Sequence, residues 1–234
     1  MKYRHLIVGA GRIGAGFQWN DMAYTHAGAS QALSDRIELV GFVEPDEERA
    51  AAAKAKWHLP AYHNIAQAME RQLETNIVSV CVQPHDQEQV FIELSPYTRL
   101  KGIWCEKPMF AQVGGSWPPI QVNYLRRADK NHQIIAQTIK QTTDRELVVM
   151  AKDDIHTRCH FEDLAEWWGA RLHYVKLVNQ PCSYVIRCKE AKGNYAERLF
   201  TLGGIDAGKA MRNMLGNLLD HLTYKTPLWS PPHA

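Results

Sequence analysis

The sequence predicts an α/β fold, in which an N-terminal, doubly wound parallel sheet is followed by a smaller α+β domain with a mainly antiparallel open sheet. Two observations support this prediction. Up to residue 105, short apolar runs alternate with helical segments, a pattern typical of right-handed βαβ units. The alternation then stops at a run rich in glycine and proline, residues 114–119. A boundary near residue 120 gives predicted domains of residues 1–120 and 121–234.

The elements of the first domain each have a local signal. The predicted strands are the apolar runs Leu6–Val8, Leu39–Val43, Ile77–Val82 and Gly102–Cys105. The predicted helical segments are Arg12–Gln18, Ala29–Leu33, Pro45–Trp57, Ile65–Leu73 and Gln87–Leu94. The third of these opens with proline and acidic residues, which favour the first turn of a helix.

The second domain mixes strands and helices in another order. Its predicted strands are Ile120–Arg126, Glu146–Met150, Leu172–Leu177, Ser183–Cys188 and Arg198–Leu202. Its predicted helices are His160–Trp168 and Ala210–Leu222, and the second carries an apolar stripe suited to a core-facing side.

Composition excludes several classes of protein. The 234 residues are 45% hydrophobic and 22% charged with a net charge of +2, and they contain no basic run, so neither nucleic acid nor an anionic membrane is an expected partner. We find no apolar stretch long enough for a signal peptide or a membrane span. The five cysteines are odd in number and lack C-x-x-C spacing, which predicts a reduced, cytoplasmic protein without a cysteine metal site.

A glycine motif follows the first predicted strand. Gly9, Gly11 and Gly14 form G-x-G-x-x-G between that strand and a helix, with Arg12 and Ile13 inside the motif. Such a turn offers main-chain N–H groups to a pyrophosphate, and it predicts a dinucleotide-binding Rossmann domain. The alternative is a tight strand–helix turn that holds no nucleotide.

Glu44 ends the second predicted strand, 30 residues after Gly14. A carboxylate at this place accepts hydrogen bonds from the ribose hydroxyls and repels a 2′-phosphate, so NAD is the expected cofactor and NADP the less favoured one. The spacing exceeds the usual value of about 20 residues, and the segment Gln18–Ala29 is the insertion that accounts for it. The alternative is that Glu44 is a solvated acid at the start of a helix.

Three further motifs resemble one enzyme family. Glu106-Lys107-Pro108 follows the predicted strand Gly102–Cys105, Val122–Arg127 resembles a strand that enters a second domain, and His156–Leu164 resembles a catalytic helix with histidine followed three residues later by aspartate. In this order, the motifs resemble the Gfo/Idh/MocA oxidoreductase family (glucose–fructose oxidoreductase and inositol dehydrogenase types), and the match runs through most of the chain.

The resemblance implies hydride transfer between a nicotinamide and a hydroxyl carbon of a sugar, polyol or sugar derivative. It makes Lys107 the group that binds the reacting oxygen and His160 the general acid or base, a role that suits an imidazole. It also implies substrate contacts from Asp163, His156, Asn123 and Tyr124, and cofactor contacts from Pro84, Glu106 and Lys107. A homo-oligomer, either a dimer or a tetramer, is expected through the sheet of the second domain.

The sequence departs from the family pattern at three places. His156 stands where many members have aspartate, Pro84 is followed by Glu88 where a proline-linked histidine is expected, and only Met109–Ile120 joins the Glu-Lys-Pro strand to the next strand. His156 and His160 could instead be metal ligands, or His160 a structural histidine. The alternative function is a catalytically inactive NAD-binding regulatory or assembly protein of the same fold.

Overall fold

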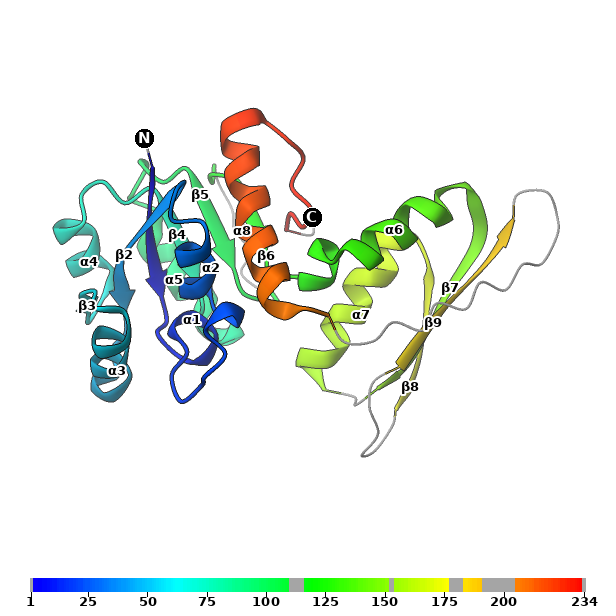
Figure 1. The fold of residues 1–234 in the computed structure, drawn as a ribbon, viewed down its shortest axis with the longest axis horizontal. Helices are drawn as coiled ribbons and strands as arrows, with labels where there is room; N and C mark the ends of the chain where they lie inside the picture. Colours follow the sequence, from blue (N-terminus) through cyan, green and yellow to red (C-terminus); the bar gives the residue numbers. More distant parts are fainter. Residues whose placement is uncertain (1, 110–115, 152–153, 177–182, 191–204, 233–234) are drawn as a thin grey trace. The chain divides into compact units, whose positions relative to one another are not determined.

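The structure is a computed structural model that describes residues 2–109, 116–151, 154–176, 183–190 and 205–232 (Figure 1). The chain forms two compact units, one of residues 1–125 with residues 207–234, and one of residues 126–206. This division differs from the expected boundary at residue 120, because the C-terminal helix α8 (Ala207–Tyr224) belongs to the first unit.

The first unit contains a six-stranded parallel sheet in the order β3-β2-β1-β4-β5-β6. The chain builds β1, β2 and β3 outward in one direction and then returns to β4 beside β1, which is the doubly wound arrangement. The strands are β1 (Tyr3–Val8), β2 (Ile37–Val43), β3 (Ala61–Tyr62), β4 (Ile77–Val80), β5 (Gly102–Cys105) and β6 (Ile120–Val122).

Helices cover both faces of this sheet. Successive side chains of a strand point to opposite faces, so each strand contributes to the core on either side. Leu6 and Val8 of β1 belong to a core shared with two of the helices, α4 (Ile65–Arg71) and α5 (Gln87–Leu94). Ile7, between them, belongs to a second core. Its other members are Ala15 of α1 (Arg12–Ala15), Ala27 of α2 (His26–Ala32), Ala53 of α3 (Glu47–Trp57), Phe42 and Ala10.

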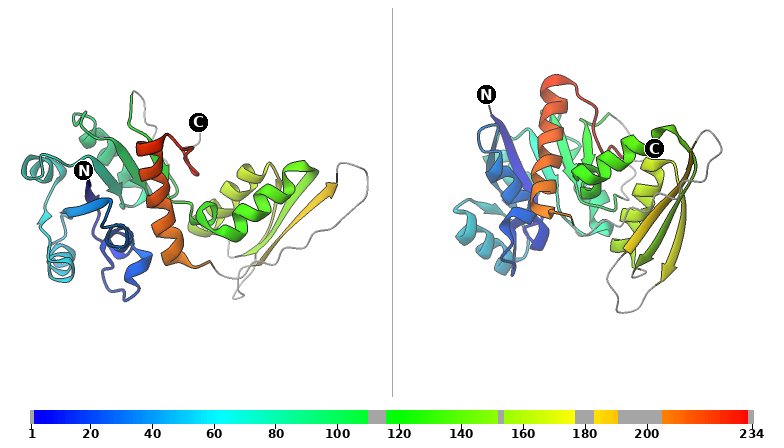
Figure 2. Two further views of the ribbon diagram at one scale, coloured as in Figure 1. Left: turned by 45° about the horizontal axis from the view of Figure 1, so that its top comes forward. Right: turned by 45° about the vertical axis from the view of Figure 1, so that its right-hand side comes forward.

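The apolar stripe of α8 explains why this helix returns to the first unit. The side chains of Met211, Met214, Leu215 and Leu218 are fully buried. A Cβ on Gly102 of β5 would lie 3.3 Å from Leu218, so the helix packs directly on this strand. Figures 1 and 2 show α8 in orange beside α2, and the structure records contacts between the two helices.

The segment after the glycine motif differs from the prediction. The helix that was expected to reach Gln18 ends at Ala15, because Gly16 adopts a left-handed conformation with φ of 75°. A 3-10 turn, η1 (Met22–Tyr24), follows, and α2 begins at His26, earlier than the predicted Ala29. Thr25 caps α2 by accepting a hydrogen bond from the Gly28 N–H.

The second unit has a three-stranded sheet in the order β8-β7-β9. The antiparallel ladder of β7 (Thr142–Ala151) with β9 (Ser183–Glu190) spans residues 142–150 of β7, and the parallel ladder with β8 (Arg171–Lys176) spans residues 146–151. Helices α6 (Lys130–Thr138) and α7 (Ile155–Trp168) supply the rest of its core, including Ile135, Phe161, Leu164 and Trp168. Together with the six-stranded parallel sheet, this confirms the predicted fold class.

In the second half of the chain, one predicted strand is too long and one helix was not predicted. The strand expected over Ile120–Arg126 is only the three-residue β6, because the 3-10 turn η3 (Leu125–Ala128) follows it. Helix α6 was not predicted at all. Two further 3-10 turns, η2 (Pro84–Asp86) and η4 (Ile139–Gln141), complete the elements of the described segments. The predicted strand Arg198–Leu202 lies outside the described residues. Among the helices that the structure describes, we find none that is long and apolar enough to cross a membrane.

Candidate active site

The sheet brings most of the predicted cofactor residues to one edge. Val8, the last residue of β1, pairs with Val43 of β2 and with Val80 of β4, so these strands end level with one another. In open parallel sheets, ligands bind beyond this carboxyl edge. The predicted residues that follow the strand ends are the glycine motif, Glu44, Pro84 in η2 and the turn Glu106–Pro108.

The three glycines of the motif have different reasons to be glycine. Gly9 has φ of +95°, and a Cβ there would lie 2.6 Å from the carbonyl oxygen of Cys81. A Cβ on Gly14 would lie 2.0 Å from the carbonyl oxygen of Gly9, whereas a Cβ on Gly11 would meet no atom within 4 Å. Gly9 and Gly14 are therefore required by the fold. Gly11, beside the exposed Arg12, leaves the open space that a pyrophosphate needs next to main-chain N–H groups.

Glu44 joins the end of β2 to the glycine motif. Its side chain is buried, and Oε2 accepts a hydrogen bond from the Ala10 N–H at 2.9 Å. Oε1 accepts from the Asp46 N–H at 3.1 Å and lies 3.2 Å from the guanidinium of Arg49. A carboxylate has about four lone-pair sites, so one site on Oε2 remains for a ligand hydroxyl. The helix-starting acid is Asp46, which caps α3, so the alternative of a solvated Glu44 is wrong.

The turn Glu106–Pro108 follows β5, and its Lys107–Pro108 peptide bond is cis. The Glu106 side chain is buried, while Lys107 is half-buried. Burial alone would raise the pKa of the Glu106 carboxyl, but the hydrogen bond and charge of His26, the hydrogen bond of Asn123 and the charge of Lys107 together lower it. The site therefore holds an ionised carboxylate next to the lysine.

A chain of buried polar side chains leads from Glu106 into the interior. Glu106 Oε1 lies 2.9 Å from His26 Nε2, and His26 Nδ1 lies 2.8 Å from Ser79 Oγ. Ser79 Oγ lies 2.7 Å from His5 Nε2, and His5 Nδ1 lies 2.7 Å from Ser30 Oγ. The chain thus connects α2, β1 and β4 to the predicted catalytic turn.

Sequence reasoning missed this chain, although a weak signal exists. His5 begins an otherwise apolar strand run, and His26 and Ser30 are four residues apart on a helix whose other inward residues are small. A buried polar residue needs a hydrogen-bond partner. Polar residues at such positions therefore predict partners, but they do not say which ones.

Asn123 and Tyr124 follow β6 and are both buried. Asn123 Nδ2 donates to Glu106 Oε1 in a short contact and also lies 3.3 Å from the sulfur of Met211. Its main-chain N–H donates to the Cys105 carbonyl at 2.8 Å. Asn123 therefore supports the Glu106 carboxylate, and its own Oδ1 is buried without a hydrogen-bond partner among the described residues.

The second unit carries the remaining predicted residues on α7. His160 is half-buried, and Asp163 is buried with its carboxylate held by Arg127, whose Nη2 lies 2.8 Å and Nε 3.0 Å from Oδ1. Arg127 also lies over the ring of Trp167, 5.6 Å from its centroid. Arg127 was not predicted as a partner of Asp163. The side chain of His156 lies outside those that the structure describes.

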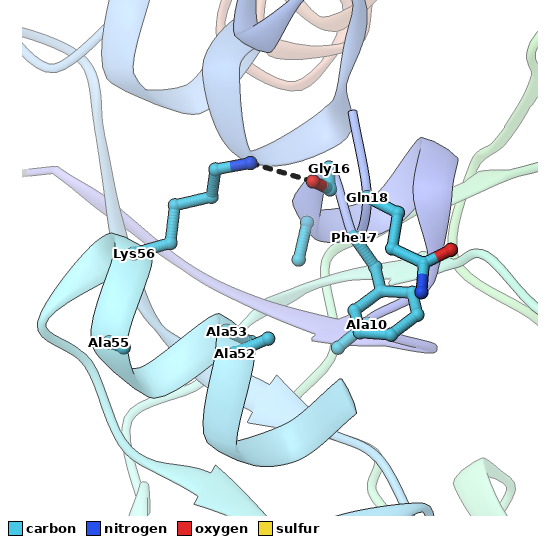
Figure 3. Close-up of a pocket in the computed structure, with 9 residues that line it drawn as sticks. Ala10, Gly16, Phe17, Gln18, Ala52, Ala53, Ala55 and Lys56 are labelled. Atoms are coloured by element: carbon cyan, nitrogen blue, oxygen red, sulfur yellow. Dashed lines mark hydrogen bonds between the residues drawn. The ribbon is translucent and has the colours of Figure 1, made fainter. Parts of the chain in front are cut away.

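A cavity of about 320 Å³ lies between the segment after α1 and helix α3 (Figure 3). Its walls include Ala10, Phe17 and three alanines of α3. Lys56 points to the main chain, where its ammonium donates to the carbonyls of Gly16 at 2.7 Å and Trp19 at 2.8 Å. The cavity is therefore apolar and contains none of the predicted site residues. Among the described residues, we find no group of three potential metal ligands.

Comparison with known proteins agrees with this geometry. Residues 3–117 match the family model described as GFO_IDH_MocA, an oxidoreductase family with an NAD-binding Rossmann fold. A search of curated proteins finds no match.

Solved structures of low sequence identity share the fold. The WlbA dehydrogenase from Bordetella pertussis, in complex with NADH and UDP-GlcNAcA, aligns with a TM-score of 0.73 and 16% identity over 99% of this chain and 91% of that one. UDP-N-acetylglucosamine 3-dehydrogenase GnnA from Acidithiobacillus ferrooxidans gives 0.68 and 13% over 99% and 92%. A myo-inositol dehydrogenase from Corynebacterium glutamicum gives 0.67 and 12% over 96% and 90%. Over residues 3–117, the chain thus matches the Gfo/Idh/MocA oxidoreductase family with its NAD-binding Rossmann fold.

Proposed function

We propose that this protein is an NAD-dependent oxidoreductase that moves a hydride between nicotinamide and a hydroxyl-bearing carbon of a sugar or sugar derivative. The observation that carries the proposal is the shared sheet edge. There, the open side of Gly11, the buried Glu44 and the ionised Glu106 beside Lys107 follow three strands of the same sheet, β1, β2 and β5. The sugar class rests on the similar enzymes, whose names include a UDP-N-acetylglucosamine dehydrogenase and a myo-inositol dehydrogenase.

The residues of the glycine motif and Glu44 would hold the dinucleotide. Gly9 and Gly14 shape the turn, Gly11 admits the pyrophosphate, and Glu44 offers its remaining lone pair to a ribose hydroxyl. A 2′-phosphate would place negative charge against the Glu44 carboxylate, so NAD is favoured over NADP. We assign Arg12, Ile13 and Pro84 to the walls of this cofactor site.

Lys107 and His160 would carry the proton chemistry. When NAD is bound, its nicotinamide accepts the hydride of the alcohol. The Lys107 ammonium stabilises charge on the reacting oxygen, and His160 takes or returns the hydroxyl proton, which contributes about 10²–10⁴-fold. Substrate contacts are assigned to Asn123, Tyr124, His156 and Asp163.

The test is turnover with a panel of sugars, polyols and nucleotide sugars, followed by absorbance of NADH. We expect Lys107→Met and His160→Ala to abolish turnover while the protein still binds NAD. Lys101→Met, which removes an exposed lysine at the start of β5, is the matched control and should leave turnover unchanged. Turnover that persists in both variants would contradict the assigned roles.

A second candidate is an NAD-binding protein without activity. Two observations favour it: Arg127 engages the Asp163 carboxylate, and only residues 106–119 separate the parallel strands β5 and β6. In this case, the protein binds NAD but turns over none of the panel, and Lys107→Met changes nothing measurable.

Self-association is a further part of the proposed function. Helices α6 and α7 cover one face of the three-stranded sheet, and Val175 of β8 is 47% exposed. We infer a dimer or tetramer through this sheet, in a reducing compartment that suits cysteines outside disulfide bonds, namely Cys81, Cys105, Cys159 and Cys188. A monodisperse monomer in light scattering would argue against the oligomer.

A further inference from the structure

In the buried chain from Ser30 to Glu106, each hydroxyl carries one proton, so the role of Ser30 as donor or acceptor determines the direction of the later hydrogen bonds. Ser30 Oγ also lies 3.1 Å from the main-chain carbonyl of His26, which can only accept. If Ser30 donates to this carbonyl, its contact with His5 Nδ1 is one in which His5 donates. The first step along the chain is therefore an Nδ1–H on His5.

His5 carries a single ring proton. Burial, and then the charge of His26, lower the pKa of His5 from its usual value to about 3. Its Nε2 must then accept the proton of Ser79. Ser79 has no second proton to give, so its oxygen accepts from His26 Nδ1–H.

At the other end of the chain, His26 Nε2 faces an ionised carboxylate, Glu106, which can only accept. Both ring nitrogens of His26 thus donate, and a ring with two N–H groups is an imidazolium. The opposite polarity allows a neutral His26, but it leaves the contact between Ser30 and the His26 carbonyl unmade. Only the imidazolium satisfies every contact of the chain.

We propose that His26 is an imidazolium that acts as a positioning residue, which neutralises Glu106 from inside the sheet and so holds in place the turn that carries Lys107. This inference rests on the function proposed above. A buried carboxylate without a partner would draw the nearest cation toward itself. His26 and Asn123 both contact Glu106 Oε1, so loss of His26 would let the carboxylate, and with it the turn to Lys107, move.

The surroundings of His26 fit this role. Its ring lies against the ring of Trp104, with centroids 3.7 Å apart, so the plane of the imidazole is held by packing as well as by hydrogen bonds. The other titratable groups at this place are His5, Lys107 and the thiols of Cys81 and Cys105. Burial, followed by the charge of Glu106, raises the pKa of both thiols, so neither adds a competing negative charge.

The direct test is nitrogen NMR of the intact protein, labelled with ¹⁵N in its histidine rings. Signals are assigned by their loss in His5→Gln and His26→Gln, or by through-bond correlations if a variant does not fold. Near pH 7.5, we expect both ring nitrogens of His26 to be protonated and His5 to be protonated at Nδ1 alone. An unprotonated ring nitrogen in His26, or His5 protonated at Nε2, would overturn the inference.

Turnover gives a second and independent readout. We expect His26→Gln to lower kcat about 100-fold, the loss that a displacement of about 1 Å in a reacting group can cause, with KM for NAD unchanged. His132→Gln, which alters another buried histidine with a carboxylate partner, Asp129, is the control and should keep kcat. An unchanged kcat in His26→Gln would also overturn the positioning role. If the unaltered protein turns over no substrate, the proposed function has failed, while the ring protonation is still decided by NMR.

Discussion

Each of the two units buries a carboxylate from its predicted site residues, and the two carboxylates are neutralised differently. Glu106 is served by two nitrogens from separate elements, His26 of α2 and Asn123 after β6. Asp163 is served by a single guanidinium, Arg127, whose Nε lies 3.0 and 3.1 Å from its two oxygens. The first carboxylate thus depends on a chain through the interior, and the second on one residue that is always charged.

The different partners separate two roles of a buried carboxylate, one beside the reacting group and one between two structural elements, which a sequence motif cannot distinguish. His26, the partner of Glu106, carries the proposed charge only because of the hydrogen bonds around it. Glu106 is also followed directly by the half-buried Lys107, the proposed catalytic residue. Arg127 holds Asp163 in a fork geometry that joins η3 to α7. We therefore expect changes at Glu106 or His26 to alter chemistry, and changes at Asp163 to lower stability in addition to any loss of the proposed substrate contact.

The largest expected effect on stability comes from breaking the ion pair between Arg127 and Asp163. Asp163→Ala removes one partner of a buried ion pair, the carboxylate that Arg127 contacts, which costs about 3–5 kcal/mol in the free energy of unfolding. Urea denaturation measures this loss. The double variant Arg127→Met with Asp163→Leu removes both charges and should recover most of the stability. A loss below about 1 kcal/mol in Asp163→Ala would be typical of an exposed pair instead.

The next effect is a loss of the free energy of unfolding at acid pH, which comes from His5 in the interior of the first unit. The folded protein keeps His5 neutral down to a pKa of about 3, whereas the unfolded chain takes up a proton at His5 below about pH 6.5. The contribution of His5 is complete above pH 6.5 and is lost as the pH falls from there toward 3. The slope is up to about 1.4 kcal/mol per pH unit. In urea titrations between pH 7.5 and 4, His5→Gln should be less stable at neutral pH but should lose stability with a shallower slope below pH 6.5. Equal slopes would contradict a neutral His5.

Gly14 gives a smaller loss of stability. In Gly14→Ala, the new Cβ would lie 2.0 Å from the Gly9 carbonyl, so the glycine turn must move, at a cost of about 1–3 kcal/mol. Thermal unfolding without ligand measures this change. An unchanged midpoint would mean that the turn is not as tight as the structure describes.

The smallest effect is a gain in stability in Gly216→Ala, which serves as the matched control for Gly14→Ala. Gly216 lies inside α8, and a Cβ there would come no closer than 3.9 Å to Leu33. Gly216→Ala should stabilise the protein by about 0.5–1 kcal/mol, because alanine is the better helix former. A loss in this variant would show that α8 does not pack as described.

The sequence was sufficient where the signals are local. Apolar runs and glycine turns predicted β1, β2, β4 and β5 of the first unit but not the two-residue β3. Register then placed the glycine motif, Glu44 and Glu106 at one edge. Helix α6 was missed because its first turns are polar, although Asp129 is a capping residue that accepts hydrogen bonds from Asn131 and His132.

The partners that act at a distance could not be predicted. Nothing local relates His5 to Ser79 or His26, since their contacts depend on three elements that come together only in the folded sheet. The return of α8 to β5 has the same origin, because an apolar stripe shows that a helix packs but does not show against which strand. Arg127 was read as part of a strand, and the turn η3 changes its direction.

The most direct test of the central claim is thermal unfolding with NAD⁺, NADH, NADP⁺ and NADPH, carried out on the unaltered protein and on Gly11→Ala. A ligand at about 100 times its Kd adds about 2.7 kcal/mol, which raises the Tm of a chain of this size by about 5–11 °C. We predict this rise with NAD⁺ and NADH only. Gly11→Ala should keep the Tm of the ligand-free protein, because its Cβ meets no atom within 4 Å, but it should lose the rise. The absence of a rise with all four nucleotides, or an undiminished rise in Gly11→Ala, would contradict a dinucleotide site at this edge of the sheet.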